Sequence, residues 1–244
     1  MWFSDNPDKA WVEKFFLMYT PVWMALMALM MVTGWAQSVG DKVLLIHAAI
    51  VALPILIIPA LLNSRKSATP WHESYWLKAN IYLFVFGFFG NYFGSEYFFD
   101  VLGMVYHYPN ASTNLDSALL GSGEQRVPLI MYFYTHAYFM TYHATANIVL
   151  RRLRNLNIPG GIALFPVMVF AVGYVWAWAE TRAMANPMLA ESFYYQDMAR
   201  MLAYRIDERR GQSWSLWVTA SAGMAASMLT FYMSDFVAHW IGAL

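Results

Sequence analysis

Four polar side chains fall on one stripe of an apolar stretch over residues 127–154. His136 and His143 are seven positions apart, so at about 100° per residue they lie within roughly 20° of each other on a helix. Tyr132 and Asn147 fall on the same stripe. A neutral imidazole takes up a proton near pH 7, and on a shared face one ring can orient the other. The stripe therefore predicts proton transfer, and hydrogen bonding between helices is the alternative for either histidine.

Two carboxyl groups belong to other apolar stretches. A carboxyl group among apolar side chains keeps its proton near neutral pH, because desolvation penalises the anion. Glu96 and Glu180 are therefore candidate acids, beside the histidines as candidate bases. Two alternatives stay open. Glu180 could pair with Arg182 or with a neighbouring helix, and Glu96 could be solvated at the end of its helix.

The composition indicates that membrane-spanning helices position these histidine and glutamate side chains. Of 244 residues, 59% are hydrophobic, 18% aromatic and only 12% charged, about half the charged share of a soluble domain. Apolar windows long enough for a bilayer core predict six transmembrane helices. They lie near residues 15–35, 43–62, 77–98, 127–150, 162–185 and 214–240. We therefore expect an all-α polytopic membrane bundle forming one domain over residues 1–244, with an amphipathic segment over residues 193–210 before the last helix.

Charge and cysteine content narrow the function classes. The absence of cysteine excludes disulfides, thiolate metal sites and cysteine nucleophiles. A net charge of zero gives no case for nucleic-acid binding. Lys and Arg concentrate before the first span and in the second and fourth loops, which favours an amino terminus in the cytoplasm. The mixed charges of the first residues indicate no removable signal peptide, so the first helix is expected to stay.

Polar and aromatic motifs inside the predicted spans support a family resemblance. They are Phe15-Phe16-Leu17, Tyr19-Thr20-Pro21, Trp23, Trp71, Tyr75-Trp76, Lys78-Ala79-Asn80, Asn91-Tyr92-Phe93, Tyr97-Phe98-Phe99, Val101-Leu102-Gly103, Thr135-His136, Tyr142-His143, Asn147, Leu150-Arg151-Arg152-Leu153-Arg154, Glu180-Thr181, Ala185-Asn186, Tyr194-Tyr195 and Asp197. In these motifs the chain resembles the cycloeucalenol cycloisomerases, the cyclopropyl sterol isomerases of plant sterol synthesis. The resemblance covers most of the sequence and favours a prokaryotic relative, and in a prokaryote the expected location is the bacterial inner membrane.

The chain also departs from the plant pattern. Glu96 stands where a histidine is expected in the plant proteins. The loop before Val127 is longer, and much of an apolar stretch between Asp197 and the last span is missing. The substrate pocket is therefore expected to differ, and an altered sterol preference or a shifted reaction fits the sequence as well as a strict equivalent.

The resemblance implies opening of a cyclopropane ring fused into a sterol, of the cycloeucalenol to obtusifoliol type. A carbon–carbon bond accepts a proton, a tertiary cation forms, and a neighbouring carbon loses a proton to give a ring double bond. The site then needs an acid, a base and a dry, electron-rich wall. No cofactor and no metal are expected. The expected partners are a sterol and the membrane lipids, and the oligomeric state stays open.

The expected site residues come from the residue patterns and from the family resemblance. The catalytic candidates are Glu96, His136, His143 and Glu180, and the substrate-binding candidates are Asn91, Tyr92, Tyr97, Asn147 and Trp176. The amides and phenols could bind the sterol hydroxyl or fix a histidine tautomer, while Trp176 could face a cation. Asn80 is expected to join helices. Arg151, Arg152 and Arg154 are expected to contact lipid phosphates or set the orientation.

Three other functions compete with isomerisation. A non-catalytic sterol or lipid carrier would keep the cavity and tolerate loss of the acid and base. A membrane di-iron hydroxylase needs closely spaced histidine boxes, which the six histidines at positions 47, 72, 107, 136, 143 and 239 do not form. A proton-coupled transporter would also use buried Glu and His, but paired repeats are missing.

Overall fold

The computed structural model describes residues 2–62, 70–95, 99, 104–115, 126–156, 161–190 and 192–195. These residues all belong to one unit, Met1–Gln196. Glu96, Tyr97 and the predicted span over residues 214–240 lie outside the described residues. The prediction of one domain over residues 1–244 therefore stays a prediction.

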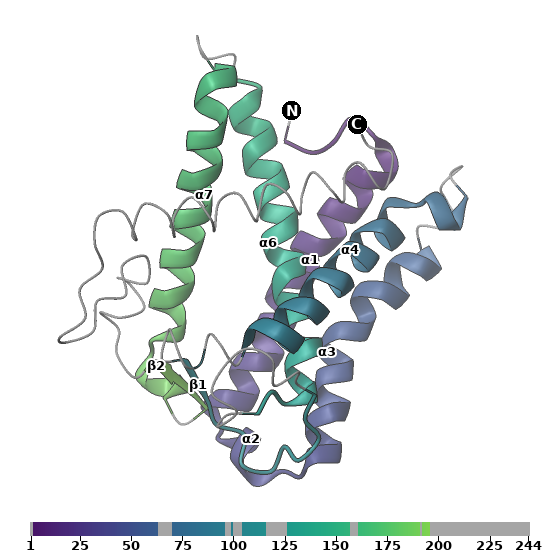
Figure 1. Cartoon of the computed structure of the whole chain (residues 1–244). Helices are drawn as coiled ribbons and strands as arrows, with labels where there is room; N and C mark the ends of the chain where they lie inside the picture. The colour runs from purple at the N-terminus through teal and green to yellow at the C-terminus, as the bar shows by residue number, and fades with distance from the viewer. Residues whose placement is uncertain are drawn as a thin grey trace, which may run out of the picture. The chain divides into compact units, whose positions relative to one another are not determined.

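Helices make up most of the described residues (Figure 1). The longer ones are α1 (Pro7–Val32), α3 (Asp41–Leu62), α4 (Tyr75–Phe89), α6 (Leu129–Arg154) and α7 (Gly161–Met184). The short elements are α2 (Trp35–Ser38), η1 (Trp71–Glu73), the π-helical turn η2 (Gly90–Gly94), η3 (Pro187–Leu189), and the strands β1 (Met104–Tyr106) and β2 (Phe193–Tyr195). Each of the five long helices overlaps one of the first five predicted spans, but α4 ends at Phe89, whereas the third predicted span extends to residue 98.

The first helix begins where the sequence supplies a cap. The side chain of Asn6 accepts hydrogen bonds from the backbone N–H groups of Asp8 and Lys9, at 2.9 and 3.2 Å, and Pro7 occupies the first turn. A polar cap and a proline at this position satisfy or remove N–H groups that have no partner within the helix. The next long helix, α3, contains Pro54 and Pro59 and continues through both.

Helix α6 is the central helix of this unit, and it packs against α1, α3, α4 and α7. Its buried side chains recur every three or four residues: Ile130, Met131, Tyr134, Ala137, Met140, Ala144 and Ile148. This spacing places them on one helical face. His136 and His143 lie outside this buried apolar stripe, so the helix can present them to a different neighbour.

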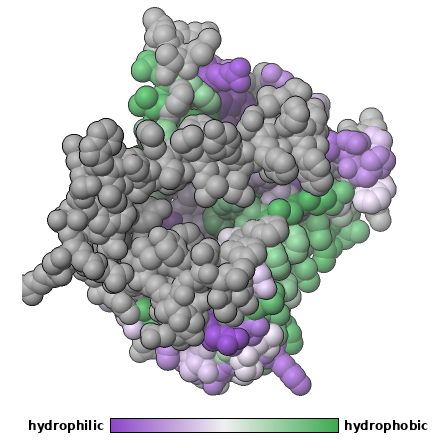
Figure 2. All heavy atoms as spheres, in the orientation of Figure 1, coloured by the Kyte–Doolittle hydropathy of each residue, from purple (hydrophilic) through white to green (hydrophobic). Residues whose placement is uncertain are grey.

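The outer surface of the long helices is apolar. Along α3 the exposed side chains include Val43, Ile46, Ile50, Leu53, Ile57 and Leu61, spaced three or four residues apart. Figure 2 shows a hydrophobic band on the side of the molecule where α3 and α4 lie in Figure 1. Polar side chains such as Glu13, Asn80 and Asn91 are buried instead. By length and composition, α1 and α3 are able to cross a membrane, which weakly supports association with a bilayer.

The prediction of an amphipathic segment over residues 193–210 is wrong for its first three residues. Phe193–Tyr195 form strand β2 and pair antiparallel with Met104–Tyr106, with Val105 opposite Tyr194. The ring of Phe193 is 1% exposed and lies 4.7 Å from the ring of Tyr106. Cross-strand burial of these aromatic rings favours an extended backbone over a helix at the membrane interface. The rest of the predicted segment, residues 196–210, lies outside the described residues.

Candidate active site

The two histidines of α6 face the same neighbouring helix, α4. Nε2 of His143 lies 2.8 Å from the hydroxyl oxygen of Tyr75, and Nε2 of His136 lies 2.8 Å from Oδ1 of Asn80. Both partners belong to α4. The seven-residue spacing therefore does place both imidazoles on one side of α6, and each is held by a partner on the facing helix.

Asn80 determines the tautomer of His136. Its Nδ2 donates to the carbonyl oxygen of Trp76 at 2.7 Å and more weakly to that of Ile55 at 3.4 Å. The amide oxygen of Asn80 can only accept, so Nε2 of His136 carries the proton and donates it. Asn80 is buried and joins α3, α4 and α6. The expectation that it connects helices is confirmed.

The other predicted binding amides are also engaged within the bundle. Asn91 donates to the carbonyl oxygen of Gly87 at 2.8 Å and to Oγ1 of Thr135 at 2.7 Å. Nδ2 of Asn147 donates to the carbonyl oxygen of His143, one turn earlier in the same helix, at 2.7 Å. These bonds connect η2 to α6 and support the backbone of the histidine helix.

Glu180 of α7 faces α6. Its Oε2 accepts a hydrogen bond of 2.9 Å from the hydroxyl of Tyr142, and Tyr138 is a second side chain that acts on this carboxyl group. The rings of Tyr142 and Trp176 lie 5.5 Å apart. The partner of Glu180 is therefore a phenol of the neighbouring helix. Glu180 and Trp176, predicted separately, meet through Tyr142.

The candidate acid and bases lie on different faces of α6. Tyr142 and His143 are consecutive, so they point about 100° apart around the helix. The first contacts α7 and the second contacts α4. The stripe of histidines is thus separated from Glu180 by part of the helix circumference.

A continuous row of aromatic rings spans this separation. In order it contains Trp176, Tyr142, Tyr138, Phe139, Phe86 and Tyr82, with neighbouring ring centroids 4.7 to 6.3 Å apart. The ring of Tyr82 lies 5.8 Å from the imidazole of His143. We call this set the aromatic row. It crosses α6 from the carboxyl group on α7 to the imidazole beside α4. Tyr92, also a predicted binding residue, stacks on Phe88 at 5.5 Å and is not a member.

A buried ion pair between α1 and α6 was not predicted from the sequence. Both carboxylate oxygens of Glu13 bind the guanidinium of Arg151, with Nη1 2.9 Å from Oε2 and Nη2 bound to Oε1. Nη1 also donates to the carbonyl oxygen of Trp2 at 2.9 Å. Glu13 is 1% exposed. Arg151 therefore pairs with a protein carboxylate in place of the expected lipid phosphate.

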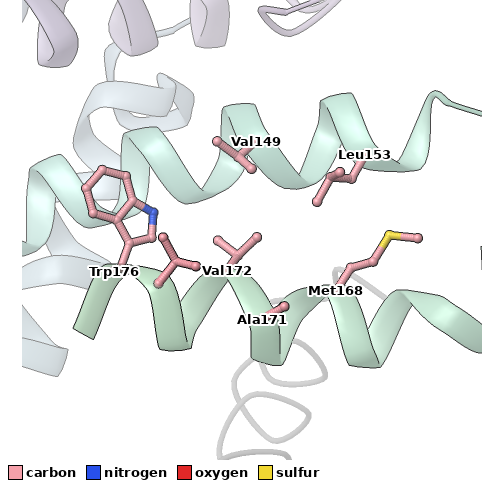
Figure 3. Close-up of a pocket in the computed structure, with 7 residues that line it drawn as sticks. Val149, Leu153, Met168, Ala171, Val172 and Trp176 are labelled. Carbon is pink, nitrogen blue, oxygen red and sulfur yellow. The ribbon is translucent and has the colours of Figure 1, made fainter. Parts of the chain in front are cut away.

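A groove of about 400 Å³ lies between α6 and α7. Its wall consists of hydrocarbon and aromatic side chains, including Val149 and Leu153 of α6 and Met168, Ala171, Val172 and Trp176 of α7. Figure 3 shows the side chains of the two helices facing each other across it. Trp176 belongs both to this groove and to the aromatic row.

No group of three or more His, Asp or Glu side chains that could hold a metal ion occurs among the described residues. Taken together, these features define a helical protein with an apolar outer surface, a buried ion pair, two imidazoles on one face of α6, and a row of aromatic rings between a carboxyl group and one of these imidazoles. The chain is 31% identical to cycloeucalenol cycloisomerase of Arabidopsis thaliana over 264 aligned residues, which cover 100% of this chain and 90% of the plant protein. No family model and no solved structure matches. The chain belongs to the cycloeucalenol cycloisomerase family.

Proposed function

We propose that this protein opens the cyclopropane ring of a cyclopropyl sterol and forms a ring double bond, a reaction of the cycloeucalenol to obtusifoliol type. Membership of the family supports the class of reaction. The single observation that carries the proposal is the Glu180 carboxyl group, which binds Tyr142 beside the rings of Tyr138 and Trp176. This isomerisation needs a proton donor, a proton acceptor and an electron-rich surface at the same ring carbons, and a carboxyl group can serve as the donor and then, as the carboxylate, as the acceptor.

The proposed reaction conserves atoms and electrons. The Glu180 carboxyl group gives its proton to a cyclopropane carbon, and the electron pair of the breaking carbon–carbon bond forms the new carbon–hydrogen bond. The other carbon of the broken bond becomes a tertiary cation. The Glu180 carboxylate then removes a proton from an adjacent carbon, whose electron pair forms the double bond, and this step regenerates the carboxyl group. His143 lies on another face of α6, beside α4, and takes no part in this proton transfer.

The aromatic row has a defined part in this scheme. Water would add to a tertiary carbocation and form an alcohol. The cation therefore needs a dry surface with negative potential. The faces of Trp and Tyr rings provide such a potential and stabilise a nearby cation by about 0.5–2 kcal/mol. Trp176, Tyr142 and Tyr138 lie next to the proposed acid, where the cation forms first.

We further propose that the chain is a multi-pass protein of the bacterial inner membrane, with six spans and a cytoplasmic amino terminus. The apolar exposed stripe of α3 and the buried polar side chains support a lipid environment around the bundle. A sterol dissolved in the bilayer then reaches α6 and α7 without crossing water, and membrane lipids surround the rest.

The test is a substrate panel. Detergent-purified protein is incubated with cyclopropyl sterols and with matched sterols that lack the small ring, and the products are separated and analysed by mass spectrometry. We expect isomers of unchanged mass from the cyclopropyl sterols alone. Binding of these sterols without any product would instead support a non-catalytic carrier.

A second prediction concerns the two histidines. Each imidazole binds a side chain of α4: His143 binds the hydroxyl of Tyr75, and His136 binds the amide of Asn80. Both lie on a different face of α6 from Tyr142, the partner of Glu180. We therefore expect His143→Gln and His136→Gln to keep kcat within a few-fold of the unchanged protein and to lower thermal stability.

Kinetics of the two purified variants, beside their melting temperatures, test this expectation. A loss of kcat of about 10²-fold or more in either variant would contradict it and would assign the proton acceptor to that histidine, since one positioned acid–base group supplies 10²–10⁴-fold.

A further inference from the structure

The groove between α6 and α7 is lined by hydrocarbon and aromatic side chains along its described length. Its volume of about 400 Å³ lies in the range of small-molecule sites, about 300–1,000 Å³. A wall without charged groups does not favour the binding of a hydroxyl or a polar head group. It stabilises a bound ligand in proportion to the apolar surface that binding removes from solvent. The chemistry of the groove therefore selects an aliphatic chain.

We propose that this groove binds the alkyl side chain of the sterol and thereby positions its ring system at Glu180. The inference rests on the proposed function and adds a substrate subsite to it. The groove is continuous with the proposed acid, because Trp176 lines the groove and also contacts Tyr142, whose hydroxyl binds Glu180. A molecule with a rigid ring system and an alkyl tail is the guest that would occupy both regions together.

Distances along α7 match this orientation. The groove runs from Met168 to Trp176, eight residues that rise about 12 Å along a helix, enough for the branched side chain of a sterol. Glu180 follows one turn after Trp176, and α7 ends one turn later at Met184. Side chain, ring system and hydroxyl would then follow each other along one helix, with the hydroxyl near its carboxyl-terminal end.

Ala171 is the smallest of the residues that line the groove, and it belongs to the α7 side. A leucine at this position adds three carbons to a site that a guest must fill. Gly173 provides a matched control two positions further on, since a Cβ built there meets no described atom within 4 Å.

The experiment compares Ala171→Leu and Gly173→Leu with the unchanged protein on two cyclopropyl sterols, one with the complete side chain and one with it removed. We expect Ala171→Leu to lower kcat/KM at least about tenfold for the complete sterol, the effect of excluding a few carbons from a pocket. Turnover of the truncated sterol should change little. The Gly173→Leu protein should stay within about twofold on both substrates. An equal loss on both substrates, or no loss on either, would overturn the proposed subsite.

A binding measurement separates this inference from the proposed reaction. The unchanged protein is labelled with a sterol that carries a photoreactive diazirine at the end of its side chain, and labelled peptides are sequenced. Labelling within residues 168–176 that unlabelled sterol displaces, and phospholipid does not, supports the subsite even if the protein turns over no sterol. Labelling elsewhere, or displacement by phospholipid to the same extent, overturns it even if isomerisation is observed.

Discussion

Replacing Glu180 with glutamine is expected to lower kcat for the isomerisation by about 10³-fold, because proton transfer from a positioned acid contributes 10²–10⁴-fold and an amide cannot replace it. The substitution preserves the size of the side chain and its ability to accept the hydrogen bond that Tyr142 donates at 2.9 Å. The groove, the aromatic row and the sterol contacts stay in place. The affinity for the sterol should therefore change little while turnover is lost.

Two controls make this loss interpretable. Glu73 lies in η1, exposed, and its carboxylate binds the ammonium of Lys78 at 2.5 Å. The hydrogen bond and charge of Lys78 lower the pKa of the Glu73 carboxyl, so it carries no proton to donate at neutral pH. Glu73→Gln should therefore behave as the unchanged protein. Tyr142→Phe keeps the acid and removes only its hydrogen bond, so we expect a smaller loss than in the Glu180 variant.

The measurement combines single-turnover kinetics with direct sterol binding. Retained turnover in Glu180→Gln would remove Glu180 from the proton path. An equal loss of binding and turnover would indicate a structural role for its contact with Tyr142, and would contradict the assignment as acid.

Replacing Arg151 with leucine is expected to destabilise the protein by about 3–5 kcal/mol, the usual cost of leaving a buried charge without its partner. Glu13 is 1% exposed, and in this variant its carboxylate would lose both guanidinium hydrogen bonds. The pair also joins the amino-terminal part of α1 to the carboxyl-terminal end of α6. The variant should therefore unfold at a clearly lower temperature in the same detergent.

The comparison uses an exposed ion pair of the same protein. Lys78→Leu removes the partner of Glu73 at the surface, where such pairs contribute about 0–1 kcal/mol, so its melting temperature should barely change. In the double variant Glu13→Gln/Arg151→Leu the buried charge is gone, and part of the stability should return. Equal melting temperatures for Arg151→Leu and Lys78→Leu would contradict the account of the buried pair.

Periodicity and composition alone predicted much of the helical architecture. The spans expected near residues 15–35, 43–62, 77–98, 127–150 and 162–185 overlap the long helices, because apolar length and helical spacing are local properties of the chain. The shared face of His136 and His143 was predictable for the same reason. The family resemblance, which rests on motifs along the whole chain, is confirmed by the similarity to the plant enzyme.

Partners across helices could not be predicted from local pattern. Nothing near Glu13 indicates Arg151, which lies 138 positions away, and nothing near Glu180 indicates the hydroxyl of Tyr142. The strand at Phe193 was missed because its partner strand begins at Met104, far earlier in the sequence. Such contacts depend on which faces the helices and strands bring together.

The sequence by itself determined that helices form, where they lie and that ionisable groups are carried within apolar stretches, since these follow from residue type and spacing. The tertiary structure decided that Glu180 and the histidines lie on different faces of α6, with the aromatic row between them. The physical reason is that α4 and α7 pack on different sides of that helix, and packing geometry is a property of the assembled elements.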